Sequence, residues 1–148
     1  MAFFISPDSL EIQNLISPNH QLGEDWVDLT LKAVFRVKAA ARLDFSGKEF
    51  SKPACEPCLP VKQEPEDDYG WWELHEGYYL LKFNEVIPPA ESVHLILQPH
   101  PHLLESGCHH PTLVLRELSA DFRCPIWIPK IGLHLKQNAR ISRIFVTK

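Results

Sequence analysis

Proline is the feature of this sequence that most restricts its fold. The 148-residue chain contains 13 prolines and only 6 glycines, and the prolines are spread over most of its length. Because proline fixes φ and lacks a backbone donor, it interrupts long helices and confines strands to short runs or sheet edges. The sequence therefore argues against a helix bundle and favours short strands.

The hydrophobic pattern between the prolines predicts where those strands lie. Residues 26–31 alternate apolar and polar side chains, which is typical of a half-buried strand. One short helix is predicted at 101–106, before Gly107, and 6–9 has the N-cap residues of a helical turn. Many short strands separated by turn signals predict an all-β sandwich or barrel. The other β-prone runs are 33–37, 77–87, 92–98, 112–118, 126–135 and 140–146.

Length and composition narrow the class of protein. The length favours one domain over residues 1–148, and 45% apolar with 23% charged residues excludes global disorder. We find no transmembrane run and no signal peptide, so we expect a cytoplasmic protein without a membrane partner. The net charge of −4 disfavours nucleic acid as a partner. Residues 46–68 lack a periodic apolar face, which predicts a mobile loop insertion.

A pair of cysteines offers a candidate zinc site. Cys55 and Cys58 are separated by two residues in a Cys-Glu-Pro-Cys turn, and a structural zinc ion needs four ligands. Cys108 and His109, with His110 beside them, are the candidates to complete the site. The alternatives are an exposed thiol pair and a local disulfide.

Histidines and arginines offer a candidate phosphate site. His100 and His102 lie in a Pro-His-Pro-His segment that presents both rings stiffly, to a metal or, when protonated, to phosphate. The C-terminal part of the chain is cationic, and arginine suits phosphate oxygens. Arg140 and Arg143 are three positions apart, so on one regular strand they point to opposite faces and cannot both line one pocket unless a bulge or a neighbouring subunit intervenes. The alternatives are a polar loop and ordinary surface charge. The cationic residues are Arg116, Arg123, Lys130, Lys136, Arg140, Arg143 and Lys148.

Four segments, taken in order, resemble the dUTPase and dCTP deaminase superfamily. Residues 26–31 (Trp-Val-Asp-Leu-Thr-Leu) resemble an early strand of the deaminases, and 77–88 is similar to their Gly-x-x-x-Leu … Glu-x-Ile-x-Leu-Pro stretch. Residues 118–124 stand in the place of Ile-Asp-x-x-Tyr-x-Gly, and 138–145 in that of Gly-x-Arg-Ile-Ala-Gln-Leu-x-Phe. The resemblance implies a distorted β-barrel of the dUTPase-like (β-clip) type. It also implies a deoxynucleoside triphosphate or related nucleotide as ligand, Mg²⁺ with that nucleotide, and a homotrimer with sites between subunits.

The resemblance also implies site residues, and it shows where this chain departs from the pattern. Ser119 stands where dUTPases carry the aspartate that orients the attacking water, and serine cannot act as a carboxylate base. His100-Pro101-His102 replaces the family's Arg-Ser-Ser phosphate segment, and the Gly-rich C-terminal arm is not found before Lys148. The predicted nucleotide-binding residues are Ser119, Phe122, Arg123, Arg140, Arg143, His100 and His102.

Three functions remain open from the sequence. The first is a nucleotide-binding relative of these enzymes with impaired catalysis, for which no catalytic residue is predicted. The second is an active dUTP or dCTP enzyme in which His100, His102, His109 or Asp121 replaces the lost groups. The third is an interaction module stabilised by metal at the cysteine pair.

Overall fold

One long strand organises the fold of the computed structural model, which describes residues 3–148. Strand β1 (Trp26–Ala39) pairs through its first half with β9 (Arg140–Thr147) and through its second half with β4 (Gly77–Phe83). The end of β1 also pairs with β2 (Ala54–Cys58), and all three pairings are antiparallel. Register shifts interrupt each of these pairings. Such irregularities bend strands, so β1 can belong to both halves of a curled sheet.

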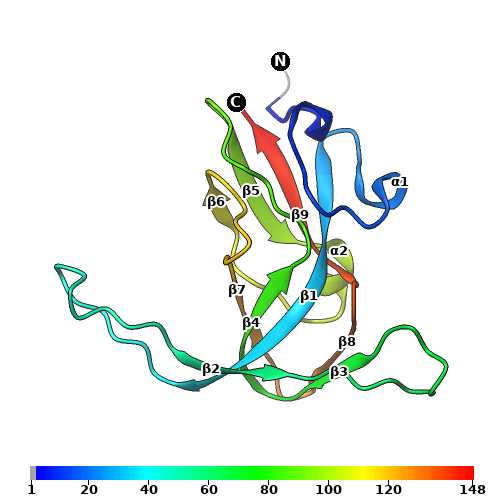
Figure 1. Cartoon of the computed structure of the whole chain (residues 1–148), viewed down its shortest axis with the longest axis vertical. Helices are drawn as coiled ribbons and strands as arrows, with labels where there is room; N and C mark the ends of the chain where they lie inside the picture. Colours follow the sequence, from blue (N-terminus) through cyan, green and yellow to red (C-terminus); the bar gives the residue numbers. More distant parts are fainter. Residues whose placement is uncertain (1–2) are drawn as a thin grey trace.

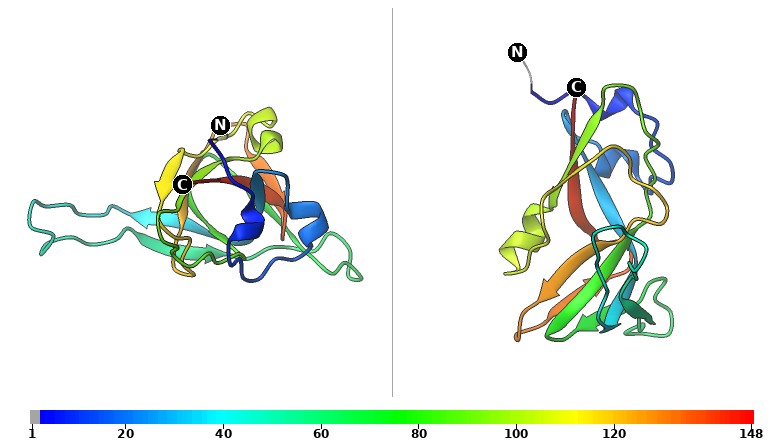
Figure 2. Two further views of the ribbon diagram at one scale, coloured as in Figure 1. Left: turned by 90° about the horizontal axis from the view of Figure 1, so that it is seen from above. Right: turned by 90° about the vertical axis from the view of Figure 1, so that its left-hand side faces the viewer.

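The main sheet has seven strands in the order β6-β5-β9-β1-β4-β7, with β2 attached to β1. A second sheet of two strands pairs β3 (Trp71–Leu74) with β8 (Leu133–Lys136). Together the strands curl into a distorted half-barrel (Figure 1), and the view from above shows the curvature (Figure 2). The all-β prediction is therefore confirmed. The remaining strands are β5 (His94–Pro99), β6 (Leu113–Leu115) and β7 (Cys124–Ile128).

The helical segments are short, as the prolines predict. The expected helix is α2 (Pro101–Glu105), with proline in its first turn, and the ring of His100 accepts a hydrogen bond from the N–H of His102 as an N-cap. Ser6 likewise caps a 3₁₀ turn at Pro7–Ser9. A one-turn helix, α1, spans Pro18–Gln21 and has proline in its first turn. Within residues 3–148 no helix has the length and apolar character needed to cross a membrane.

One predicted strand is two strands in the structure. The run 126–135 is interrupted by a turn at Pro129, after which the chain leaves β7 and enters β8 in the other sheet. Gly132 adopts a φ of +83° there, and a side chain at this position would meet the carbonyl oxygen of Leu74. Hydrophobicity alone does not reveal this break, because the residues on both sides of it are apolar.

The core lies inside the curl of the sheet. Alternate residues of β1, β4, β7 and β9 point inward, and Leu29, Leu81, Ile126 and Ile144 are fully buried. Two carboxylates, Asp28 and Glu85, are also buried. A buried carboxylate requires partners, so these two residues mark the region where a site can be sought.

The segment that we expected to be a loop insertion is largely a hairpin. Residues 40–53 extend the β1–β2 pair as an arm that projects from the body (Figure 1), with Arg42 and Ser51 paired along it. β2 has only β1 as a partner and is an edge strand, the position in which Pro57 is tolerated. Residues 59–70 then form a loop that leads to β3.

Limited proteolysis tests the predicted mobility of this segment. We expect trypsin to cut first after Lys48 at the tip of the arm and after Lys62 in the following loop, because both side chains are exposed and few tertiary contacts hold these turns. β2 lies between the two sites and contains no lysine or arginine, so trypsin should release it within one fragment. Mass spectrometry of the early fragments identifies the cuts, and initial cleavage after Lys82 in β4 would contradict the prediction.

Candidate functional site

A buried aspartate is the centre of the candidate site. The side chain of Asp28 on β1 is only 2% exposed, and Arg143 donates from Nε to its Oδ1 at 2.8 Å. Nη1 of Arg140 lies 3.4 Å from Oδ2, and Nε2 of His100 lies 3.5 Å from the same oxygen. Three basic side chains thus surround one carboxylate. The low dielectric of the interior strengthens their attraction to it, and this attraction offsets the cost of burying the charge.

A β-bulge brings the two arginines to the same face. The pairing of β9 with β1 runs through Ser142 and then moves directly to Arg140, so Ile141 has no partner on β1. Ile141 and Ser142 are both buried, which breaks the inside–outside alternation of a regular strand. The prediction that Arg140 and Arg143 point to opposite faces was therefore wrong, because it assumed a regular strand.

The two arginines differ in their exposure and in the number of contacts they make with Asp28. Arg143 is 20% exposed, contacts both carboxylate oxygens and places its guanidinium 4.6 Å from the centre of the Trp26 ring. Arg140 is 41% exposed and uses only Nη1, which also donates to the carbonyl oxygen of His20 at 2.9 Å. For its Nε and Nη2 no acceptor is found among residues 3–148. Arg140 therefore retains donors that can bind an external anion.

The two histidines adjoin Arg140. Because Nδ1 of His100 accepts from the N–H of His102, the proton of the neutral ring is on Nε2, which faces Asp28. Burial lowers the pKa of His100, and the charge of Asp28 opposes this effect. The rings of His100 and His102 are in edge contact, 4.7 Å between centres. His102 and Arg140 line a cavity of about 350 Å³, so the structure brings Arg140, Arg143, His100 and His102 into one cluster.

A second polar network, absent from the sequence prediction, supports the first. Glu85 accepts hydrogen bonds from the N–H and hydroxyl of Thr30 and from the side-chain amide of Gln21. The same amide donates to the carbonyl oxygen of Asp28 at 2.9 Å, so the two networks meet at β1. Burial raises the pKa of Glu85, against the effect of these hydrogen bonds. The sequence signals were the polar pair Asn84-Glu85 within an apolar run and the match of Glu85 to the glutamate of the Glu-x-Ile motif.

The other predicted nucleotide residues lie elsewhere in the subunit. Phe122 and Arg123 line a cavity of about 600 Å³ together with Asp121, and Ser119 is an exposed residue of the turn before them. The ring of Phe122 stacks on Phe83, with 6.4 Å between centres. In the main sheet, β1 and β4 separate β9 from β7. A single chain therefore does not bring Ser119, Phe122 and Arg123 to the arginine cluster.

The structure does not assemble the predicted zinc site. Cys55 and Cys58 are three positions apart on β2, so they face opposite sides, and each lines a different cavity. Cys108 is buried beyond the end of α2, whereas His109 is exposed. In the part of the chain that the structure describes, no group of three or more potential ligands can hold a metal ion. All four cysteines are free thiols, so the disulfide alternative is not formed either.

Comparisons with known proteins agree with the resemblance seen in the sequence. No family model matches the chain. A probable deoxyuridine 5'-triphosphate nucleotidohydrolase of Methanosarcina mazei is 27% identical over 139 residues, which cover 90% of this chain and 75% of that protein. The proteins of the same name from Methanococcoides burtonii and Archaeoglobus fulgidus are 28% and 27% identical over 137 and 140 residues. These matches cover 90% and 93% of this chain, and 76% and 74% of the relatives.

A solved structure supports the fold. The 2'-deoxycytidine 5'-triphosphate deaminase of Agrobacterium tumefaciens superposes with a TM-score of 0.56 at 13% identity. The match covers 94% of this chain and 43% of the deaminase chain. The protein thus has a dCTP deaminase-like fold, and its resemblance to the dUTPase and dCTP deaminase superfamily is confirmed.

The buried histidine His110 makes the stability of the protein depend on pH. Its Nδ1 donates to the carbonyl oxygen of Pro111 at 2.9 Å, so Nε2 accepts from the hydroxyl of Ser142 at 2.7 Å and the ring is neutral. Burial lowers the pKa of His110 below 6.5. In the unfolded chain the ring binds its proton at a higher pH than in the folded protein. The contribution of His110 to the free energy of unfolding is therefore fully present above pH 6.5. It is lost as the pH falls through the lower pKa that His110 has in the folded protein.

We expect His110→Gln to reduce this dependence. Between pH 6.5 and 5, the slope of the unfolding free energy against pH should fall by up to about 1.4 kcal/mol per pH unit, the contribution of one proton. Glu85 has the opposite sign, since its pKa is raised, and its contribution remains in both proteins. Urea unfolding at several pH values measures the slope, with replacement of the exposed His75 by glutamine as the matched control. An unchanged slope in His110→Gln would refute this account.

Proposed function

We propose that the protein is a dUTPase-like nucleotide-binding protein whose catalysis is impaired. The observation that carries this proposal is the arginine cluster: Asp28 fixes Arg143 and orients Arg140, which keeps free donors beside a cavity of about 350 Å³. A guanidinium held in this way binds phosphate oxygens by charge-assisted hydrogen bonds. The relatives named probable deoxyuridine 5'-triphosphate nucleotidohydrolase support a deoxynucleoside triphosphate as the ligand.

The proposed impairment rests on Ser119. In dUTPases the corresponding residue, as the resemblance aligns them, is the aspartate that orients the attacking water. Serine has no charge at neutral pH and accepts a proton poorly. The turn that carries Ser119 is exposed. Phe122, at the end of the same turn, keeps an aromatic ring for stacking. We therefore propose that this end of the site recognises the sugar and base but activates water poorly.

A specific observation favours an active enzyme as the second candidate. Asp121 lines the same 600 Å³ cavity as Phe122 and Arg123, so a carboxylate is present two residues from the lost one. If Asp121 activates water in place of Ser119, the protein hydrolyses or deaminates dUTP or dCTP. Turnover measurements distinguish this candidate from the first.

The proposal extends to the oligomeric state of the protein and to its metal ion. We propose a single domain over residues 1–148 that forms a homotrimer in the cytoplasm, because a neighbouring subunit can bring the Phe122 region to the arginine cluster that one chain leaves apart. The described residues do not fit a protein-held Mg²⁺, since Asp28 is occupied by basic side chains and no cluster of three ligands exists among residues 3–148. In this proposal Mg²⁺ arrives only on the phosphates of the nucleotide.

Replacing the two arginines separately tests the phosphate site. Arg140→Ala should weaken nucleotide binding roughly 10- to 150-fold with little loss of stability, because it removes a charge-assisted hydrogen bond. Arg143→Ala should instead lower the free energy of unfolding by about 2–4 kcal/mol, because it leaves buried Asp28 underpaired. Calorimetric titration with a non-hydrolysable dUTP analogue and urea unfolding measure the two effects. Arg116→Ala is the matched control, and equal small losses in all three variants would refute a defined site.

Turnover tests the proposed impairment. With dUTP or dCTP and Mg²⁺ we expect no measurable product from the natural sequence, and appreciable dUTP hydrolysis from Ser119→Asp, which restores a carboxylate. Phosphate and pyrophosphate release, with chromatography of the nucleotides, measures both reactions. Efficient turnover by the natural sequence that is lost in Asp121→Asn would establish the second candidate instead.

A further inference from the structure

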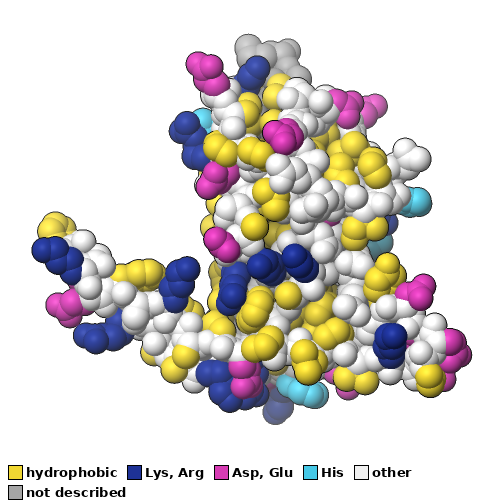
Figure 3. Space-filling model, viewed as in Figure 1, with side chains coloured by type: hydrophobic (Ala, Val, Ile, Leu, Met, Phe, Trp, Pro, Cys, Tyr) yellow, Lys and Arg dark blue, Asp and Glu magenta, His cyan; other side chains and the backbone are white. Residues whose placement is uncertain are grey.

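The projecting arm carries large apolar side chains that the subunit itself does not cover. Leu43 is 86% exposed, Phe45 is fully exposed and Phe50 is half exposed. In Figure 3 the arm stands clear of the body with hydrophobic and basic side chains along it. Isolated exposed apolar residues are ordinary, but three on one hairpin are typical of a surface that meets a partner.

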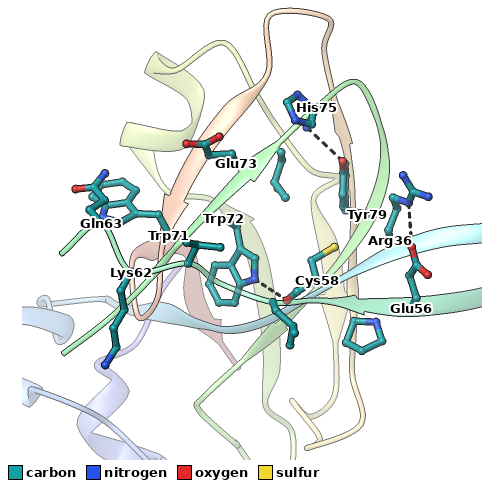
Figure 4. A pocket seen from close by; sticks show the side chains of 14 residues that line it. Arg36, Glu56, Cys58, Lys62, Gln63, Trp71, Trp72, Glu73, His75 and Tyr79 are labelled. Carbon is teal, nitrogen blue, oxygen red and sulfur yellow. Dashed lines mark hydrogen bonds and ion pairs between the residues drawn. The ribbon is translucent and has the colours of Figure 1, made fainter. Parts of the chain in front are cut away.

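The same chain offers a groove that fits such side chains. A cavity of about 610 Å³ lies between β2, the loop after it and β3 (Figure 4), with Trp71, Trp72 and Tyr79 among its lining residues. Two further lining residues, Leu59 and Val61, are 81% and 69% exposed. The geometry is fixed, because the indole N–H of Trp72 donates to the carbonyl oxygen of Cys58 at 2.8 Å. The exposed Leu59 and Val61 and the half-buried Trp71 thus form the accessible apolar lining of the groove, above the buried rings of Trp72 and Tyr79.

Charge distinguishes the arm from the loop beside the groove. The arm contains Arg42, Lys48 and Lys52 against two acidic residues, whereas residues 62–68 contain four acidic residues against one lysine. Among residues 3–148, ion pairs are found for Arg42 but for none of the four acids in 62–68. The arm and this loop extend toward opposite sides of the molecule in Figure 1 and in the view from above in Figure 2. The arm cannot reach its own groove without leaving the β1–β2 pairing, so the complementary partner is another molecule.

We propose that the arm of one subunit docks into the β2–β3 groove of a second copy of this chain. Leu43, Phe45 and Phe50 would cover the exposed Leu59 and Val61 beside the tryptophans, with the basic arm next to the acidic loop. The contact joins two different surfaces, so it is heterologous, and it closes into a ring only when successive rotations add to a full turn. This inference concerns a surface remote from the arginine cluster and does not depend on nucleotide binding.

Self-association of the natural protein and of surface variants tests whether the arm forms the proposed contact. Sedimentation velocity over a range of concentrations should show an oligomer that weakens about 100-fold or more in Leu43→Ser/Phe45→Ser/Phe50→Ser. Leu59→Ser/Val61→Ser should weaken it similarly from the groove side. Both variants should keep the thermal unfolding of a folded chain, because the replaced side chains are exposed. Val114→Ser, which removes an exposed apolar side chain from β6, is the matched control and should associate normally.

Mixing the variants tests whether the arm meets the groove. The arm variant keeps its groove and the groove variant keeps its arm, so a 1:1 mixture should form arm–groove contacts and sediment faster than either variant alone. Added salt should weaken the association of the natural protein, and it should weaken the association of Glu66→Gln/Asp68→Asn less. A monomeric natural protein, an oligomer that neither the arm variant nor the groove variant weakens, or a mixture that sediments no faster than the separate variants would each overturn the proposal.

Discussion

The buried charge of Asp28 is the interaction on which the rest of the site depends. A carboxylate placed in the interior of a β-sheet is tolerated only when basic groups and hydrogen bonds replace water around it. Here Arg143 and Arg140 reach it from β9, and His100 reaches it from the N-cap of α2. The pairing of β1 with β9 and the position of α2 therefore follow in part from the need to compensate one charge.

A hydrogen-bond network extends beyond the side chains that contact the carboxylate of Asp28. Gln21 joins the backbone of Asp28 to the carboxylate of Glu85, and Glu85 in turn fixes Thr30 on the same strand. Asn84 continues the chain of hydrogen bonds to Thr30 and Asn138, just before β9. Networks of this kind stabilise a unique arrangement only when each member is satisfied. This explains why the small helix α1, although only one turn long, has a defined place: its last residue supplies the linking amide.

The sequence allowed much of the fold to be predicted, since period-two alternation and proline positions are local properties. The strands at 26–31 and 140–146 and the helix at 101–106 were found in this way. His100 and Arg140, both singled out from the sequence, do lie together in the structure, where each contacts Asp28. Contacts between residues far apart in the sequence could not be predicted in this way. Asp28 gave no sign of being the common partner, and the spacing of Cys55 and Cys58 predicted a shared ligand because it was taken as a turn, whereas the segment is an edge strand.

The bulge at Ile141 shows that the geometry of this site is encoded in the length of a strand as well as in its residue types. Inserting one more residue between Arg140 and Arg143, without a second bulge, would preserve every charged group and much of the apolar pattern, yet it would turn Arg140 away from Asp28 to the other face of the sheet. A relative could thus keep the entire set of polar residues and still lack the cluster. When such chains are compared, an insertion or deletion within β9 carries more functional information than a conservative substitution at either arginine.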